Sequence, residues 1–368
     1  MSMILAVASH AGVKVIEMRS ANSRRVGTTR VFRSRLDDLG ACSLVLVPGM
    51  PVKNLALDAP TSTRSGSRTE PAVLLRAAIA LLLAAILLAS VVAVRTYRFE
   101  RTAAAPSRHR VVRPEAAELR DTEDVVFRTA GGASLHGWFL PSRNGATIVL
   151  THGSGADRTQ LVPQAVALAH RGFGVLLFDW PGHGESEGQP AYGEAEREAL
   201  SSALDLLASR DSDGRIGAFG FSLGAWVVAQ VAPLDPRVGA VVLEGALTDL
   251  VEQTRYEYRR WGPLTQWPAL LALRDTEAWQ GPYPSATLPR LAPRPLLIIA
   301  GADDTSVPPS MAEQLFRAAR EPKELWIVPD AGHGNVWSVA RREYEERLAA
   351  FFTHALLRPQ PSREERGK

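Results

Sequence analysis

The residues Gly220-Phe221-Ser222-Leu223-Gly224 match the pattern G-x-S-x-G, which places a serine on a sharp turn between a strand and a helix. Such a turn needs small residues two positions away on either side, and glycine has no Cβ to clash. The pattern also occurs by chance, as a Gly-Ser loop without function, so its surroundings matter. Here a buried strand is predicted over residues 215–219 and a helix of small residues over 225–232. Strand, turn and helix therefore predict that Ser222 is a nucleophile.

A serine hydroxyl is a weak nucleophile at neutral pH, so it needs a base that takes its proton and a carboxylate that orients the base. In a parallel sheet, such groups are expected on loops at the carboxyl ends of strands. Of the eight histidines, only His333 lies on a loop between the last predicted strand and the last helix. His152 and His183 also follow strands, but they lie inside glycine turns. A loop histidine is more often a plain surface residue, yet its place after Ser222 predicts His333 as the base.

Two neighbouring carboxylates follow the predicted strand that ends at Ala300. Either Asp303 or Asp304 can orient His333, and Asp304 is favoured because a glycine three positions earlier lets the loop bend and point it inward. A carboxylate pair before a helix is often only a helix cap, and Glu244, after the preceding strand, is the alternative acid. The predicted order along the chain is serine, aspartate, histidine.

Backbone N–H groups must face the negative charge that develops on the substrate oxygen. One is expected from Leu223, which opens the helix after the serine and adds the helix dipole. The other is expected from Ser154, in the loop after the strand that ends at Thr151. The glycine-rich segment 178–186 does not fit the dinucleotide-binding fingerprint, because its third glycine is misplaced. We interpret it as a structural turn beside the site.

The composition narrows the possible functions. The 42 Lys and Arg residues nearly balance the 39 Asp and Glu residues, and the arginine excess lies in the N-terminal third. No folded basic face with interleaved aromatic residues is evident, so a nucleic-acid partner is not expected. The single cysteine, Cys42, excludes an intramolecular disulfide and a cysteine-ligated zinc site. The commonest metalloprotease and nucleotide-binding motifs are absent, so neither a metal nor an organic cofactor is expected. The oligomeric state is left open.

From about residue 122 the hydrophobic pattern becomes regular. A hairpin is predicted over 124–129 and 135–140, followed by apolar strands that alternate with helices. This alternation predicts a mostly parallel sheet with helices on both faces. The further strands are expected at 147–150, 174–178, 215–219, 238–243, 295–300 and 324–328, and the helices at 161–171, 194–210, 225–232, 308–320 and 337–357.

An apolar run with Ser90 as its only polar member predicts a transmembrane helix over residues 72–95. The run from Ala77 to Val94 would rise about 27 Å at 1.5 Å per residue, just enough for a hydrocarbon core of about 30 Å. Arginines at both ends fit interfacial anchors. A buried core helix and a cleaved signal peptide are the alternatives. Arginines are more numerous after the run than before it, which favours a cytoplasmic C-terminal domain in a single-pass membrane protein.

The remaining segments complete the predicted organisation. Residues 1–71 carry scattered arginines and a Ser/Thr/Pro-rich stretch, and they are expected to be disordered; Met50 is an alternative start. Residues 96–121 form a linker, 122–357 the main domain, and 358–368 a disordered tail. Residues 247–291 depart from the alternation, and the family resemblance that follows implies that they form a short lid. Its aromatic residues either line an apolar acyl site or pack the lid onto the core.

Five segments, T-H-G-S-G, F-D-W-P-G-H-G-E-S, G-F-S-L-G, G-A-D-D-T-S-V-P and A-G-H-G, together resemble the α/β-hydrolase superfamily over residues 122–357. The chain is most similar to its bacterial serine hydrolases that include BEM46-like proteins, which often carry an N-terminal membrane segment. The resemblance implies the α/β-hydrolase fold with a short lid. It also implies that Ser222 is the nucleophile, Asp304 the acid and His333 the base, with Ser154 and Leu223 forming the oxyanion hole.

The expected function is hydrolysis of a small-molecule or lipid-like carboxylic ester or thioester through an acyl-enzyme. A serine peptidase of the same fold is the first alternative. It is disfavoured by the short lid, and an acidic pocket group placed to hold an amine would favour it. A dehalogenase is disfavoured, because Ser222 stands where an aspartate would be needed. A non-catalytic membrane protein on a hydrolase fold is the alternative from another class.

Overall fold

The computed structural model describes residues 2–9, 12–19, 71–104, 108–210, 215–274, 276 and 281–357. The chain divides into two units, residues 1–70 and 71–368. In the first unit, β1 (Ser2–Ser9) and β2 (Gly12–Arg19) pair antiparallel. These strands differ from the disorder expected there, and the valines and isoleucines of both stretches favour extended pairing. The rest of the predicted N-terminal disorder, and the predicted tail, lie outside the described residues.

The second unit begins with a single long helix, α1 (Pro71–Ala104). Its residues Pro71–Phe99 are long and apolar enough to cross a membrane. Their most apolar stretch of 18 residues has a mean hydropathy of 2.9 and is not buried by the protein. This exposure argues against a buried core helix. The helix continues past the predicted end at residue 95, because residues 96–104 contain no glycine or proline to stop it.

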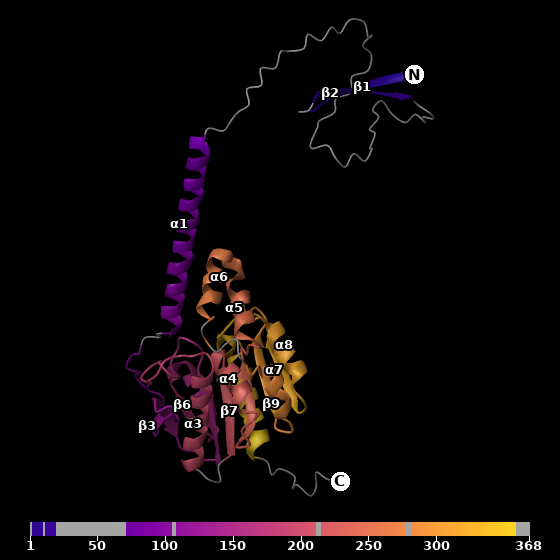
Figure 1. The fold of residues 1–368 in the computed structure, drawn as a ribbon. Coiled ribbons are helices and arrows are strands. Elements are labelled where there is room, and N and C mark those ends of the chain that lie inside the picture. Colours follow the sequence, from indigo (N-terminus) through magenta and orange to yellow (C-terminus); the bar gives the residue numbers. More distant parts are fainter. Residues whose placement is uncertain are drawn as a thin grey trace. The chain divides into compact units, whose positions relative to one another are not determined.

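An eight-stranded sheet forms the centre of the second unit, in the order β10-β9-β8-β7-β5-β6-β4-β3. Figure 1 labels β3, β6, β7 and β9 of this sheet. β3 and β4 form the predicted hairpin, β4 pairs antiparallel with β6, and every other neighbouring pair is parallel. The predicted mostly parallel sheet is therefore confirmed. Its strands are β3 (Glu123–Arg128), β4 (Ser134–Leu140), β5 (Ala146–Thr151), β6 (Gly174–Phe178), β7 (Arg215–Phe221), β8 (Val238–Glu244), β9 (Leu296–Gly301) and β10 (Lys323–Val328).

Helices cover both faces of the sheet and divide its core in two. Val149 of β5 belongs to one hydrophobic cluster, and its neighbours Ile148 and Leu150 belong to the other, because successive side chains of a strand point to opposite faces. The first cluster includes residues of α3 (Glu194–Arg210), α4 (Leu223–Val231) and α8 (Pro309–Ala318); the second includes residues of α2 (Val162–His170) and α10 (Arg341–Phe352).

Between β8 and β9 the chain forms α5 (Leu250–Tyr258), a single 3₁₀ turn (Arg259–Trp261), α6 (Pro263–Ala272) and α7 (Pro284–Thr287). α5 packs on α6, and α6 packs on α1. The aromatic residues of this segment follow neither expected role as a group. Tyr258 lines a cavity, whereas Trp261 and Trp267 are exposed to solvent. Trp279 lies outside the described residues.

Candidate active site

Ser222 lies on the turn between β7 and α4, with a backbone φ of 53° and ψ of −115°. This left-handed conformation is costly for a residue with a side chain, so the surrounding packing must enforce it. A Cβ on Gly220 would lie 2.5 Å from the backbone of Gly224, and a Cβ on Gly224 would lie 2.1 Å from the carbonyl oxygen of Thr151. The close approach of the backbone therefore requires glycine at both positions. The turn then places Ser222 at the carboxyl end of β7.

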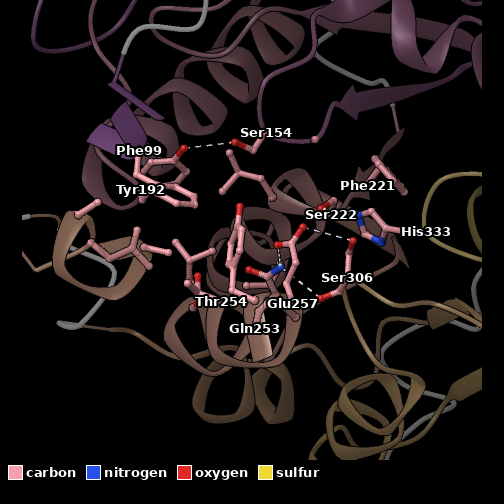
Figure 2. A pocket seen from close by; sticks show the side chains of 18 of the residues that line it. Phe99, Ser154, Tyr192, Phe221, Ser222, Gln253, Thr254, Glu257, Ser306 and His333 are labelled. Carbon is pink, nitrogen blue, oxygen red and sulfur yellow. Dashed lines mark hydrogen bonds between the residues drawn. The ribbon is translucent and has the colours of Figure 1, made fainter. Parts of the chain in front are cut away.

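His333 lies between Ser222 and Asp304. Its Nε2 is 3.0 Å from the Ser222 hydroxyl oxygen, and its Nδ1 is 2.7 Å from Oδ2 of Asp304. The imidazole is 23% exposed and the Asp304 side chain 2% exposed. The ring of Phe221 packs against the imidazole with 5.0 Å between ring centres (Figure 2). The three polar side chains come from loops after β7, β9 and β10. They meet because the carboxyl ends of these parallel strands lie on the same side of the sheet.

The two carboxylates after β9 have different surroundings. Asp304 is buried, and its Oδ1 accepts hydrogen bonds from the backbone N–H groups of Ser306, at 2.8 Å, and Val307, at 2.7 Å. Its other oxygen is left for His333. Asp303 is exposed. The backbone therefore orients Asp304 toward the imidazole, and Asp303 is the residue that faces water.

Glu244, the alternative acid from the sequence, lies at the end of β8 and is buried. Its carboxylate accepts a 2.5 Å hydrogen bond from the Tyr344 hydroxyl, and its backbone carbonyl accepts the N–H of Ser222 at 2.9 Å. Burial raises the pKa of Glu244 to about 7, against the smaller lowering effects of Tyr344 and His333. The Glu244 carboxylate is thus hydrogen-bonded to a tyrosine, whereas the imidazole of His333 is hydrogen-bonded to Asp304.

Ser154 and Leu223, the two predicted N–H donors, line the same cavity as Ser222. In the part of the chain that the structure describes, neither backbone N–H has an acceptor. The neighbouring N–H of Gly153, by contrast, donates to the Gln160 side chain at 2.8 Å. The Ser154 hydroxyl lies 3.3 Å from the hydroxyl of Tyr192 (Figure 2). Two unused N–H donors therefore accompany the serine and the histidine.

The loop that carries Ser154 is held by two buried histidines. His183 Nε2 accepts the N–H of Gly155 at 3.2 Å, and His152 Nε2 accepts the N–H of Trp180 at 3.1 Å. Burial lowers the pKa of each histidine to about 4. Both imidazoles are therefore neutral at pH 7, the state in which one ring nitrogen can accept. The predicted structural turn after β6 thus fixes the loop beside the serine.

A buried ion-pair network supports the same turn. Arg158 is almost fully buried and pairs with both Asp179 and Glu185. Its guanidinium stacks on the ring of Trp138, 4.6 Å from the ring centre. A Cβ on Gly184 would collide with the Asp179 carboxylate, so the glycine-rich sequence of this turn has a packing reason. Arg158 has no recognisable signal in the sequence, because its partners come from another loop.

A cavity of about 390 Å³ opens beside the serine. Its mainly apolar wall comes from the lid and from α1: Phe99, Leu247, Leu250, Tyr258, Ala269, Ala272 and Leu273. Among the described residues, no group of three or more His, Cys, Asp or Glu side chains is arranged to hold a metal ion. The cavity can hold an apolar group next to the Ser222 hydroxyl, which lies within hydrogen-bond distance of His333.

A polar cluster on α5 also lines the cavity, and no motif in the sequence predicted it. The Gln253 amide donates to Glu257 Oε2 at 2.7 Å and to the carbonyl of Ser306 at 3.2 Å. The Ser306 hydroxyl donates to Glu257 Oε1 at 3.4 Å (Figure 2). Within the described ranges, Glu257 has no ion-pair partner. The i, i+4 spacing placed Gln253 and Glu257 on one helix face, but nothing in the sequence showed that this face meets the serine.

Comparisons with known proteins agree with this architecture. A family model described as "Alpha/beta hydrolase family" matches residues 148–350. The uncharacterized protein Rv2307c of Mycobacterium tuberculosis is 33% identical over 238 residues, which are 64% of this chain and 80% of that protein. The uncharacterized protein YfhR of Escherichia coli K12 is 29% identical over 245 residues, which are 64% of this chain and 81% of that protein.

A similar solved structure is that of the esterase Pf2001 of Pyrococcus furiosus. It has a TM-score of 0.59 and 23% sequence identity, covering 69% of this chain and 98% of that one. At this identity the likeness concerns the fold. The family match contains the loops that carry Ser154, Ser222, Asp304 and His333.

Proposed function

This chain belongs to the α/β-hydrolase family, and from this we propose that it is a serine hydrolase that cleaves carboxylic esters or thioesters through an acyl-enzyme. One observation carries the proposal. Ser222, His333 and Asp304 form a continuous hydrogen-bonded chain of 3.0 and 2.7 Å, the geometry in which a base activates a hydroxyl. The same geometry disfavours a non-catalytic role on a hydrolase fold.

In the proposed first half-reaction, the Ser222 oxygen attacks the substrate carbonyl carbon while His333 Nε2 takes the hydroxyl proton. Asp304 holds the Nδ1–H and stabilises the imidazolium that forms. The oxygen of the tetrahedral intermediate accepts the N–H groups of Leu223 and Ser154. When the intermediate collapses, the bond from carbon to the leaving oxygen or sulfur breaks. His333 then gives its proton to the departing alcohol or thiol.

In the second half-reaction, water attacks the acyl-enzyme. His333 takes one water proton, and the second tetrahedral intermediate collapses to release the carboxylic acid. The proton then returns to Ser222, and the site is restored. None of these steps requires a metal or an organic cofactor.

The test is covalent labelling followed by turnover. A fluorophosphonate probe is expected to label the purified full chain, and the label is expected to vanish in Ser222→Ala. Panels of p-nitrophenyl esters and acyl thioesters with graded chain length then measure turnover and acyl preference. Absence of both labelling and turnover in the folded protein would overturn the proposal.

We also propose that α1 is a single-pass membrane anchor, as in BEM46-like proteins, followed by a hydrolase domain over residues 122–357 with its lid at 247–291. The support is the exposed apolar surface of Pro71–Phe99 and the arginines that follow it, which favour a cytoplasmic domain. Protease protection in sealed vesicles tests the orientation. Mass analysis of the mature membrane-bound protein tests the alternative of signal-peptide cleavage.

One observation favours serine peptidase activity as the second candidate. The Glu257 carboxylate lines the cavity with Ser222 and has no cationic partner in the described part of the chain. An acidic group in this position can hold a substrate amine. Peptidyl and aminoacyl p-nitroanilides compared with neutral esters distinguish the two candidates, because a peptidase would turn over the anilides and lose that activity in Glu257→Gln.

A further inference from the structure

Helix α6 is apolar on two opposite faces. On the inner face, Ala269 is buried and lines the cavity. Leu273, which directly follows the last residue of the helix, is also buried and lines the cavity. The outer residues Leu264, Trp267 and Leu271 are 48%, 63% and 44% exposed. Their spacing of three and four places them on one side of the helix, and we call them the outer stripe. A soluble surface rarely carries such a stripe without a partner.

The outer stripe begins at the level at which the apolar part of α1 ends. Arg95 follows Val94, the last apolar residue of the span, and its guanidinium donates to the carbonyl of Leu264 at 3.2 Å and to the Thr265 hydroxyl at 2.6 Å. If α1 crosses a bilayer, Arg95 lies near the headgroups. The first turn of α6 is then at the membrane surface.

The C-terminal part of α1 also reaches the cavity. Val92, Thr96 and Phe99 are partly buried at helical spacing, and the ring of Phe99 meets that of Tyr258 edge-on with 5.0 Å between centres. Phe99 and Tyr258 both line the cavity beside Ser222, and Figure 2 shows Phe99 at its wall. One wall of the cavity is therefore continuous with the anchor.

The 3₁₀ turn before α6 has the composition of a membrane interface. Trp261 is 62% exposed, and the Arg260 guanidinium lies 5.3 Å from the centre of its ring. Arg259 is also exposed. Tryptophan prefers the headgroup region, and arginine is attracted to anionic headgroups. This turn and the outer stripe thus present aromatic, cationic and apolar groups together.

We propose that the outer stripe and Trp261 dip into the same bilayer surface from which α1 emerges. The cavity then receives an ester or thioester whose acyl chain is dissolved in that membrane, passing between α1 and the lid. The occupant of the stripe is lipid, because the stripe lies beside the anchor. The substrate part of this inference rests on the proposed hydrolase activity, whereas the membrane contact does not.

The contact is tested by fluorescence quenching. The full chain is reconstituted into vesicles of phosphatidylcholine and phosphatidylglycerol, with and without bromine on the phosphatidylcholine acyl chains. Bromolipid is expected to quench the tryptophan fluorescence of the wild type. The Trp261→Phe/Trp267→Phe variant is expected to lose a clear share of that quenching. Trp337→Phe, a half-buried tryptophan outside the lid, is the control and keeps it. Equal quenching in all three proteins overturns the contact.

The substrate is tested by comparing two esters with the same acyl chemistry, one short and soluble and one long and carried in the vesicles. Leu264→Ser/Trp267→Ser/Leu271→Ser is expected to hydrolyse the soluble ester normally and to lose roughly ten-fold in rate on the vesicle ester. Val339→Ser, which is exposed elsewhere, leaves both rates unchanged. An equal rate of the triple variant and wild type on the vesicle ester overturns the inference.

Two further outcomes separate the possible failures. If bromolipid quenches the lid but neither ester is hydrolysed, the hydrolase proposal and the substrate fail while the membrane contact stands. If the outer stripe instead joins two copies of the chain, bromolipid does not quench the fluorescence of its tryptophan, Trp267. The triple variant then changes the mass of the detergent-solubilised protein, and this result overturns the inference.

Discussion

Asp304 uses its two carboxylate oxygens for different tasks: Oδ1 accepts two backbone N–H groups from its own loop, and Oδ2 lies 2.7 Å from His333 Nδ1. The backbone therefore locks the rotamer that points at the imidazole. This arrangement gives the adjacent carboxylate, Asp303, no share in orienting the base.

Asp304→Asn is expected to lower kcat/KM for a p-nitrophenyl ester by roughly 10³-fold or more, because an amide can stabilise the wrong imidazole tautomer. Asp303→Asn, the matched control one residue earlier, is expected to change it less than about two-fold, as for an exposed substitution. Steady-state kinetics on both variants measures the difference. A large loss in Asp303→Asn with little loss in Asp304→Asn would reverse the assignment.

Gly224→Ala is expected to destabilise the protein by about 3 kcal/mol or more, since its Cβ would lie 2.1 Å from a backbone oxygen that cannot move freely. Gly131→Ala is the control, because the closest atom to a Cβ there is a Glu198 side-chain oxygen at 3.4 Å. Urea unfolding of the detergent-solubilised proteins measures both. Equal stability of the two variants would show that the close approach is not real.

The free energy of unfolding is expected to fall as pH rises from about 4.5 to about 7, because of Glu244. Its pKa in the folded protein is about 7, above the ordinary 4.5. Between these values the folded state keeps a proton that the unfolded chain has lost, which amounts to about 3 kcal/mol over the whole interval. The contribution is present at low pH and is lost above pH 7.

Urea unfolding of the wild type and of Glu244→Gln at pH 5 and pH 8 checks this. The glutamine variant keeps an oxygen for the Tyr344 hydroxyl and is expected to lose this part of the pH dependence. Glu346→Gln, an exposed carboxylate on α10, should behave like the wild type. An unchanged pH dependence in Glu244→Gln would contradict the raised pKa.

Glu257→Gln is expected to lower kcat/KM roughly ten-fold for esters or amides that carry a cation, and to leave neutral esters within about two-fold, as for one partly screened charge. Glu252→Gln, an exposed carboxylate on the same helix, is the control. Paired substrates that differ only in a trimethylammonium or an isosteric tert-butyl group provide the measurement. Equal losses on both substrates would mean that Glu257 only shapes the cavity.

Local pattern was enough to predict the sheet, because the strands from β5 to β10 are apolar runs separated by turn residues. It also predicted which residues follow the carboxyl ends of those strands, and parallel pairing makes such ends neighbours. Ser222 and His333 are predicted on this ground, and the structure places their side chains in contact. Asp303, Asp304 and Glu244 all follow strand ends, so the pattern does not decide between them.

Only the tertiary structure separated these acids, because the direction of a carboxylate depends on the backbone hydrogen bonds it accepts. Only the tertiary structure shows that Glu244 accepts a hydrogen bond from Tyr344, which lies 100 residues later in the chain, on α10. Phe99 belongs to an apolar helix and Glu257 to an amphipathic one. Neither sequence pattern shows that the residue lines a cavity beside Ser222. Sequence determined which elements form and where chemistry gathers, since these follow from short-range periodicity; tertiary packing decided which side chains meet.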